Sequence, residues 1–226
     1  MINTIEDFKF KSEHKVDWKW ISRYQNLSET FIEEHRGDVD WMEISWKQHM
    51  SEAFIEKHHD RVVWWWISFG QILSETFIEK YHGRMSWHYI SMNQKLSEAF
   101  IDKHRDDVDW VNISEYQKLS EAFIRKYCGD VNWWQISKNQ KLSETFIDEH
   151  HDRVHWGNIS AHQHLSMTFI EKHFDDVDWE EISVNKYIGE EMLREYSFDD
   201  NSFNMRRKEL LKYVIFDLIT LIAQFR

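Results

Sequence analysis

The chain has 226 residues, of which 42% are hydrophobic and 16% aromatic, so it can build a core and falls outside the low-hydrophobicity class of disordered chains. Its formal net charge of −12 argues against nucleic-acid binding, because affinity for a phosphate backbone comes largely from Lys and Arg. Proline is absent and glycine numbers only six, which disfavours turn-rich sandwiches and barrels and favours helices joined by short connections.

The first fifteen residues resemble an incomplete copy of a repeat that fills the middle of the chain. Phe8 stands in the phase of that repeat, but the LSE motif that precedes most of the other phenylalanines is missing. We therefore predict that residues 1–15 form a partial N-terminal repeat that caps the array. This segment lacks the charged and apolar regions of a signal peptide, and the single Cys128 has no partner for an internal disulfide, so we expect an intracellular, cytoplasmic protein.

Residues 16–196 carry the tandem repeat. Tryptophan returns every 23 residues without insertion or deletion, which is typical of a repeat architecture. Each repeat reads close to VDWxxISxxQxLSExFIxKH, as in residues 108–127. We predict a structural, core-facing role for the repeat tryptophans, which are Trp18, Trp41, Trp64, Trp87, Trp110, Trp133, Trp156 and Trp179.

Each repeat predicts two short helices. From Val108, an apolar residue, an N-cap aspartate and an apolar residue four positions after the cap have the spacing of a hydrophobic staple. Leu119, Ser120 and Ile124 repeat that spacing for a second helix. Helices of about two turns are not stable alone, so the repeats must stack on one another. The sequence therefore predicts an all-α solenoid of short two-helix repeats with a C-terminal capping helix.

Other recurrent positions predict how the repeats join. Val63 and His155 replace the usual polar N-cap of the first helix, and we expect those helix ends to fray. Ser and Gln recur beside the core stripe, as in Ser45 and Gln48, and predict hydrogen bonds between repeats. The residue before the repeated phenylalanine is always Ala or Thr, which suggests that helices approach closely there.

The variable positions of the first helix contain unexpected aromatic residues. Positions one, two and five after the repeat tryptophan point away from the predicted core stripe, yet several are apolar. They are Trp20, Trp46, Trp65, Trp66, Phe69, Tyr89, Met92 and Trp134. Since large exposed apolar patches mark binding sites, we predict a binding surface here. The competing interpretation is that this face packs against a neighbouring helix layer or against the C-terminal helix. Within the WWW stretch, only Trp64 is expected to face the core.

The histidines and the paired acidic residues have structural interpretations. The second helix ends in His in many repeats but in Tyr81 or Tyr127 in others, an exchange that suits ring packing and not a metal ligand. We therefore expect no metal site and no cofactor. Acidic residues one helical turn apart, such as Glu29 and Glu33, predict a solvated face. The alternative is an acidic ridge that occupies a partner's basic groove.

Residues 197–226 are predicted to be a linker followed by a longer helix. The helix is apolar on one side, and we expect it to cap the last repeat. An alternative is that it forms a homo-oligomer contact or lies on a membrane surface, because an uncovered apolar surface is a liability. Its longest apolar stretch, residues 213–223, is interrupted by Asp217 and is too short to span a bilayer.

The phrase DWxxISxxQxLSExFI, carried by nearly the whole span from Val16 to Ile182, resembles tandem-repeat proteins of large DNA viruses and bacteriophages. This resemblance implies a helical array and a viral origin, and it brings no catalytic residues. Because common catalytic and phosphate-binding motifs are also absent from the sequence, we expect no enzyme. The predicted function is non-catalytic binding of a protein partner of unknown identity, a host protein if the chain is viral. Self-assembly and sequestration of a small ligand are the alternatives.

Overall fold

The computed structural model describes residues 16–185 and residue 187. The chain divides into two compact units, residues 1–112 and 113–226, and the division falls within one helix. The predicted N-terminal partial repeat, the last residues of the predicted array and the predicted capping helix lie outside the described residues.

Every regular element of the described part is helical, which confirms the all-α solenoid of two-helix repeats. The first helices of the repeats are α2 (Trp18–Tyr24), α4 (Trp41–Lys47), α6 (Trp64–Gly70), α8 (Trp87–Asn93), α10 (Trp110–Tyr116), α12 (Trp133–Asn139), α14 (Trp156–His162) and α16 (Trp179–Val184). The second helices are α3 (Glu29–Glu34), α5 (Glu52–Lys57), α7 (Glu75–Lys80), α9 (Glu98–Lys103), α11 (Glu121–Lys126), α13 (Glu144–Glu149) and α15 (Met167–Lys172), and a 3-10 turn, η1 (His82–Arg84), follows α7.

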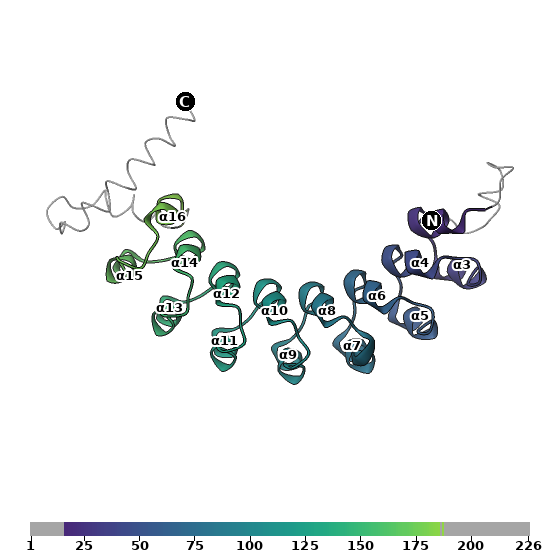
Figure 1. Cartoon of the computed structure of the whole chain (residues 1–226), viewed down its shortest axis with the longest axis horizontal. Coiled ribbons are helices and arrows are strands. Elements are labelled where there is room, and N and C mark those ends of the chain that lie inside the picture. Colours follow the sequence, from purple (N-terminus) through teal and green to yellow (C-terminus); the bar gives the residue numbers. More distant parts are fainter. Residues whose placement is uncertain (1–15, 186, 188–226) are drawn as a thin grey trace, which may run out of the picture. The chain divides into compact units, whose positions relative to one another are not determined.

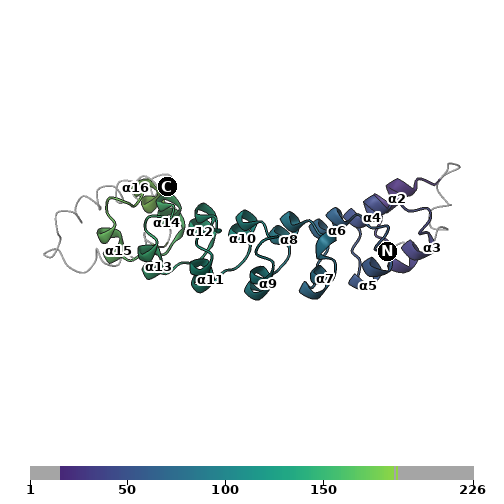
Figure 2. The ribbon, with the colours of Figure 1, turned by 60° about the horizontal axis from the view of Figure 1, so that its bottom comes forward.

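Within each unit, the first helices form one row and the second helices form another (Figure 1). Figure 2 shows α2 at the head of the first row of the N-terminal unit, followed by α4, α6 and α8. Neighbours in this row pack on each other: α2 on α4, α4 on α6 and α6 on α8, and in the second unit α12 on α14 and α14 on α16. Within each unit, these neighbouring repeats thus contact one another, as expected for a solenoid.

The helix starts follow the predicted capping pattern, except that the polar cap residue Ser86 forms no capping bond and His155 forms one. The serine before each second helix accepts a hydrogen bond from the amide of the repeated phenylalanine, as Ser74 does from Phe77. Val63 has no side-chain capping bond, and neither does Ser86. His155 was predicted to leave its helix uncapped, but its Nδ1 accepts a hydrogen bond of 3.2 Å from the Asn158 amide. An imidazole nitrogen with a free lone pair can therefore replace the usual cap oxygen.

The core is made of isoleucine and phenylalanine, and the repeat tryptophans lie at its edge. The recurrent Ile of the first helix, such as Ile67, and the Ile of the second helix, such as Ile78, are completely buried. All eight repeat tryptophans are only half-buried, which differs from the predicted core position. Trp64, for example, contacts Phe77 and Tyr81 of its own repeat, and its Nε1 donates to the His59 carbonyl. These rings cover the core from one side.

Serine and glutamine side chains link the repeats through hydrogen bonds, as predicted. Ser45 Oγ donates to the Trp41 carbonyl within its helix and accepts from the Val63 amide of the next repeat, at 2.6 and 2.9 Å. Gln71 Nε2 donates to the Gln48 carbonyl at 2.7 Å, and its Oε1 accepts from the Met50 amide at 3.0 Å. Backbone groups that stacking removes from water are thereby satisfied.

The small residue before each repeated phenylalanine does not mark a close helix approach. All members of this series are exposed: Thr30, Ala53, Thr76, Ala99, Ala122, Thr145 and Thr168. The prediction was wrong because the position lies on the outer side of the second helix, where no helix of the described part of the chain packs against it.

Candidate binding surface

Five of the predicted surface aromatics meet in the N-terminal unit. Trp46 of α4 stacks on Trp66 of α6, with ring centroids 4.7 Å apart. Trp65 of α6 lies 5.0 Å from Tyr89 of α8, and Phe69 lies 5.1 Å from the same tyrosine. Trp65 and Trp66 contact each other at 4.1 Å. We call these five residues, from three adjacent first helices, the aromatic cluster.

The cluster combines packed rings with exposed ones. Trp65 and Phe69 are exposed, at 43% and 38% of their surface. Trp46, Trp66 and Tyr89 are half-buried, because they lie between neighbouring helices. Trp66 and Trp64 are both half-buried. The prediction that only Trp64 of the WWW stretch faces the interior was therefore wrong. Rotation around a helix of 3.6 residues per turn moves Trp66 away from its own repeat but toward the preceding one.

Two cations border the cluster at Trp46. Lys47 Nζ lies 3.7 Å from the centroid of the Trp46 ring, and the Arg23 guanidinium carbon lies 5.2 Å from it. Arg23 also pairs with Glu43, whose side chain is only 2% exposed, at 3.7 Å. Glu43 Oε2 has no hydrogen-bond partner. The buried carboxylate thus holds Arg23 beside the rings through charge alone.

The other predicted surface residues, Trp20, Met92 and Trp134, are not members of the cluster. Trp20 is exposed and contacts Tyr24, which Arg23 connects to Trp46 through a cation–π contact on each ring. Met92 is half-buried on α8. Trp134 is exposed on α12 of the second unit, where Lys138 lies 4.9 Å from its ring. It belongs to a separate unit and contributes nothing to the cluster.

Sequence reasoning missed several exposed apolar residues in and after the first helices, including Met42 and Val111 at position one after the repeat tryptophan. Tyr24 stands six positions after its repeat tryptophan and is 60% exposed. Ile72, at position eight, is 92% exposed, where other repeats have Asn, Lys, His or Tyr. A comparison of every position of the aligned repeats, instead of only positions one, two and five, would have revealed Tyr24 and Ile72.

The paired acidic residues lie on an outer face that solvent reaches, as predicted, and they also connect the repeats. Glu29 Oε1 accepts from the Ser51 amide of the next repeat, and Glu75 does the same for Ser97. Glu33, one helical turn after Glu29, contacts Lys57 at 3.1 Å and His58 Nε2 at 2.6 Å. The first acid of each of these pairs therefore accepts a hydrogen bond at the start of the second helix in the next repeat. The second acid contacts the histidine at the end of that same helix.

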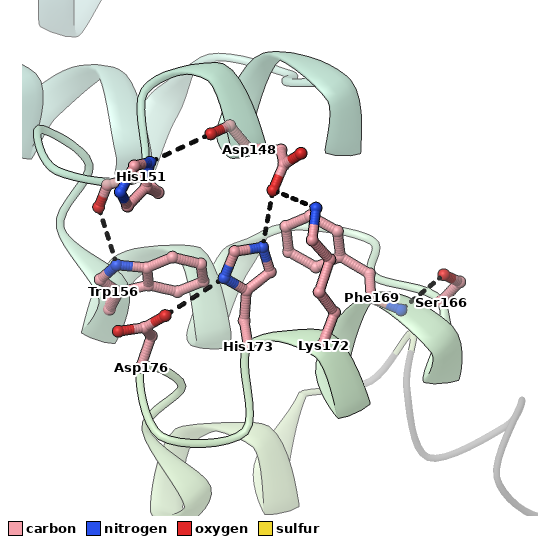
Figure 3. Close-up of polar contacts among 8 residues, drawn as sticks. All are labelled: Asp148, His151, Trp156, Ser166, Phe169, Lys172, His173 and Asp176. Atoms are coloured by element: carbon pink, nitrogen blue, oxygen red, sulfur yellow. Dashed lines mark hydrogen bonds and ion pairs between the residues drawn. The ribbon is translucent and has the colours of Figure 1, made fainter.

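The recurrent histidine packs as a ring and also binds a carboxylate. Figure 3 shows His173 between Asp148 of the preceding repeat, 3.0 Å from Nε2, and Asp176, 3.1 Å from Nδ1. Its ring contacts Trp156 and Phe169, and Lys172 contacts the same Asp148 oxygen. Among the described residues, no group of three or more His, Cys, Asp and Glu side chains is arranged to hold a metal ion.

These contacts lower the pKa of the carboxylates. The hydrogen bond from Lys57 lowers the pKa of Glu33, and the bond from His58 lowers it further, against the opposing effect of burial. Lys103 and then His104 lower the pKa of Glu79, and Lys172 and then His173 lower that of Asp148. All three groups are stabilised as carboxylates in the folded state.

We expect these links to make the fold acid-sensitive. A carboxyl whose pKa is lowered by folding stabilises the fold fully above its ordinary value, 4.5 for Glu33 and 3.8 for Asp148, and this stabilisation is lost as the pH falls through the lowered value. Melting temperatures of the wild type should therefore fall more steeply below those values than those of a variant with Glu33→Gln, Glu79→Gln and Asp148→Asn. Parallel pH profiles would contradict this origin of acid sensitivity.

Two further features of the described residues concern membrane spanning and surface hollows. Among the helices in that part of the chain, none is long and apolar enough to cross a membrane. A hollow of about 660 Å³ in the second unit is lined by residues that include Lys138, His162, His164 and Tyr187, and it contains no member of the aromatic cluster. The cluster is therefore a surface and not the wall of this hollow.

The fold and the surface define the class of protein, an α-solenoid repeat protein with an aromatic patch on one row of helices. Comparisons with known proteins extend this no further: no protein-family model, no curated protein and no solved structure matches the sequence.

Proposed function

We propose that the N-terminal unit binds a protein partner, without catalysis, through the aromatic cluster. The observation that supports this is the position of Trp65 and Phe69: both are exposed, on a helix whose Ile67 is completely buried. The repeat has a separate core of Ile and Phe, so stacking does not require these two rings at the surface. Exposed aromatic side chains grouped on a rigid face are typical anchors of protein interfaces.

The cluster also has the layout of an interface. Its centre is α6, which carries no charged residue between Trp64 and Gly70, and its border carries Lys47 and Arg23. An apolar centre with a polar rim is the usual anatomy of a protein-binding patch. The resemblance to viral repeat proteins makes a host protein the partner that we propose.

A double variant, Trp65→Ser with Phe69→Ser, tests this function. Affinity capture from the native cell should lose the proteins that the wild type retains, whereas the melting temperature should change little, since loss of two partly exposed rings costs about 1 kcal/mol or less. Trp134→Ser is the matched control, because Trp134 is equally exposed but lies in the other unit. Undiminished capture by the folded double variant would contradict the proposal.

A further inference from the structure

We infer that the partner segment bound by the aromatic cluster is an acidic peptide, with apolar side chains flanked by aspartate or glutamate. This inference rests on the proposed function and specifies the chemistry of the partner. It follows from an uneven distribution of charge between the two helix rows of the N-terminal unit.

The two rows carry opposite net charge. Helices α2, α4, α6 and α8 contain three cationic side chains, Lys19, Arg23 and Lys47, and one carboxylate, Glu43. Helices α3, α5, α7 and α9 contain nine carboxylates and three lysines. Between their first and last residues, the helices that carry the aromatic cluster therefore have a net positive charge, although the N-caps Asp17 and Asp40 add two carboxylates at their starts and the whole chain has a net charge of −12.

The carboxylates near the cluster are already engaged. Glu43 is buried against Arg23, so it is not available to a partner. Asp40, at the start of α4, accepts hydrogen bonds from the Met42 and Glu43 amides. Asp109 is paired with His88, which contacts Tyr89 of the cluster. A partner that approaches the rings meets cations without competing free carboxylates on these helices.

Lys47 and Arg23 hold positions from which they can bind two groups at once. Both lie over the Trp46 ring, and a cation over an aromatic face keeps its outer side open to an anion. A partner carboxylate next to an apolar anchor on Trp65 or Phe69 would pair with them. A basic partner would meet like charges at the same place, which is unfavourable.

A peptide suits this surface better than a single-stranded nucleic acid, which also combines negative charge with apolar rings. Base stacking requires open ring faces, but the Trp46 ring already stacks on Trp66 and has Lys47 Nζ 3.7 Å from its centroid. Trp65, Phe69 and Tyr89 meet edge to face, at angles of 83° to 86°, and do not form a series of parallel platforms. The net charge of −12 further disfavours a phosphate backbone.

Fluorescence anisotropy with the full chain tests the inference. The probe is a labelled peptide of about 16 residues in which Leu and Phe alternate with Asp and Glu, in about 0.15 M salt. The comparison probes are the same peptide with lysine in place of every acid, and an oligothymidylate of equal length. We expect the acidic peptide to bind about tenfold or more tightly than the basic one. Equal binding of both peptides, tighter binding of the oligothymidylate, or no binding of the acidic peptide would overturn the inference.

Variants separate this inference from the proposed function. Lys47→Glu should weaken binding of the acidic peptide about tenfold, and the matched control Lys138→Glu, beside Trp134 in the other unit, should leave it unchanged. If Lys47→Glu has no effect, the charge argument is wrong. If Trp65→Ser with Phe69→Ser leaves acidic-peptide binding unchanged, the aromatic site itself is wrong. If both peptides bind equally and both lose binding in that double variant, only the preference for acids fails.

Discussion

Replacement of Gln140 by leucine should lower the free energy of unfolding by about 3–5 kcal/mol, because it leaves three buried backbone groups without partners. Gln140 Nε2 donates to the Ser114 and Gln117 carbonyls at 3.0 and 2.7 Å, and its Oε1 accepts from the Leu119 amide at 3.0 Å. Leucine has similar volume but offers none of these bonds. The loss exceeds that of a typical surface substitution because each buried group then lacks both a protein partner and water.

Denaturant unfolding, followed by circular dichroism, measures this effect. Lys141→Leu is the matched control, since it places the same new side chain on the adjacent exposed position. Gln140→Asn should give an intermediate loss: Asn185, which stands one position before the equivalent point of the last described repeat, still donates to the Ser160 and Gln163 carbonyls. A Gln140→Leu variant within about 1 kcal/mol of the wild type would mean that these backbone groups find other partners.

The spacing of the sequence predicts this network well. The period of 23 residues places the same side chain at the same point of every repeat, so a polar residue beside the core stripe must meet its equivalents in the adjacent repeats. The serine caps and the short helices follow from local patterns that need no tertiary information. For these reasons the fold class, the helix pairs and the Ser and Gln bonds could be derived before the structure.

The candidate site was only partly predictable, because burial depends on the preceding repeat. Trp65 and Trp66 occupy adjacent variable positions, but only Trp66 stacks on Trp46, which stands 20 residues earlier. The acids are a similar case: Glu29 and Glu33 look like repelling neighbours on one helix, whereas their partners are Ser51 and His58 of the next repeat. The register of stacking decides which interaction forms, and a single repeat does not reveal that register.

One link in the described array has reversed charge. His58, His104 and His173 each bind a carboxylate that stands 25 residues earlier, and that carboxylate also pairs with the lysine before the histidine. For His150, the residue 25 positions earlier is Arg125, which pairs with Glu149 at 2.7 Å. His150 Nε2 is buried and has no hydrogen-bond partner. The exchange of acid and base preserves the ion pair but removes the acceptor for the histidine.

Restoring the common arrangement should therefore stabilise the second unit. We expect Arg125→Glu with Glu149→Lys to raise the free energy of unfolding by about 1–2 kcal/mol, since a buried ring nitrogen gains a carboxylate and the exposed ion pair is kept in reverse. Part of the gain is offset because Arg125 also lies 4.9 Å from the Phe146 ring, a contact that the swap removes.

The mirror experiment uses the N-terminal unit. Glu79→Arg with Lys103→Glu keeps an ion pair but removes the carboxylate that lies 2.7 Å from His104 Nε2. If the hydrogen bond of the histidine decides stability, the two swaps should change the denaturation midpoint in opposite directions at pH 7. If the ion pair alone decides it, neither swap should matter, because each one keeps two opposite charges at the same pair of positions. Equal shifts of the two denaturation midpoints in the same direction would contradict both explanations. The effect would then come from the packing of the aliphatic parts of the exchanged side chains.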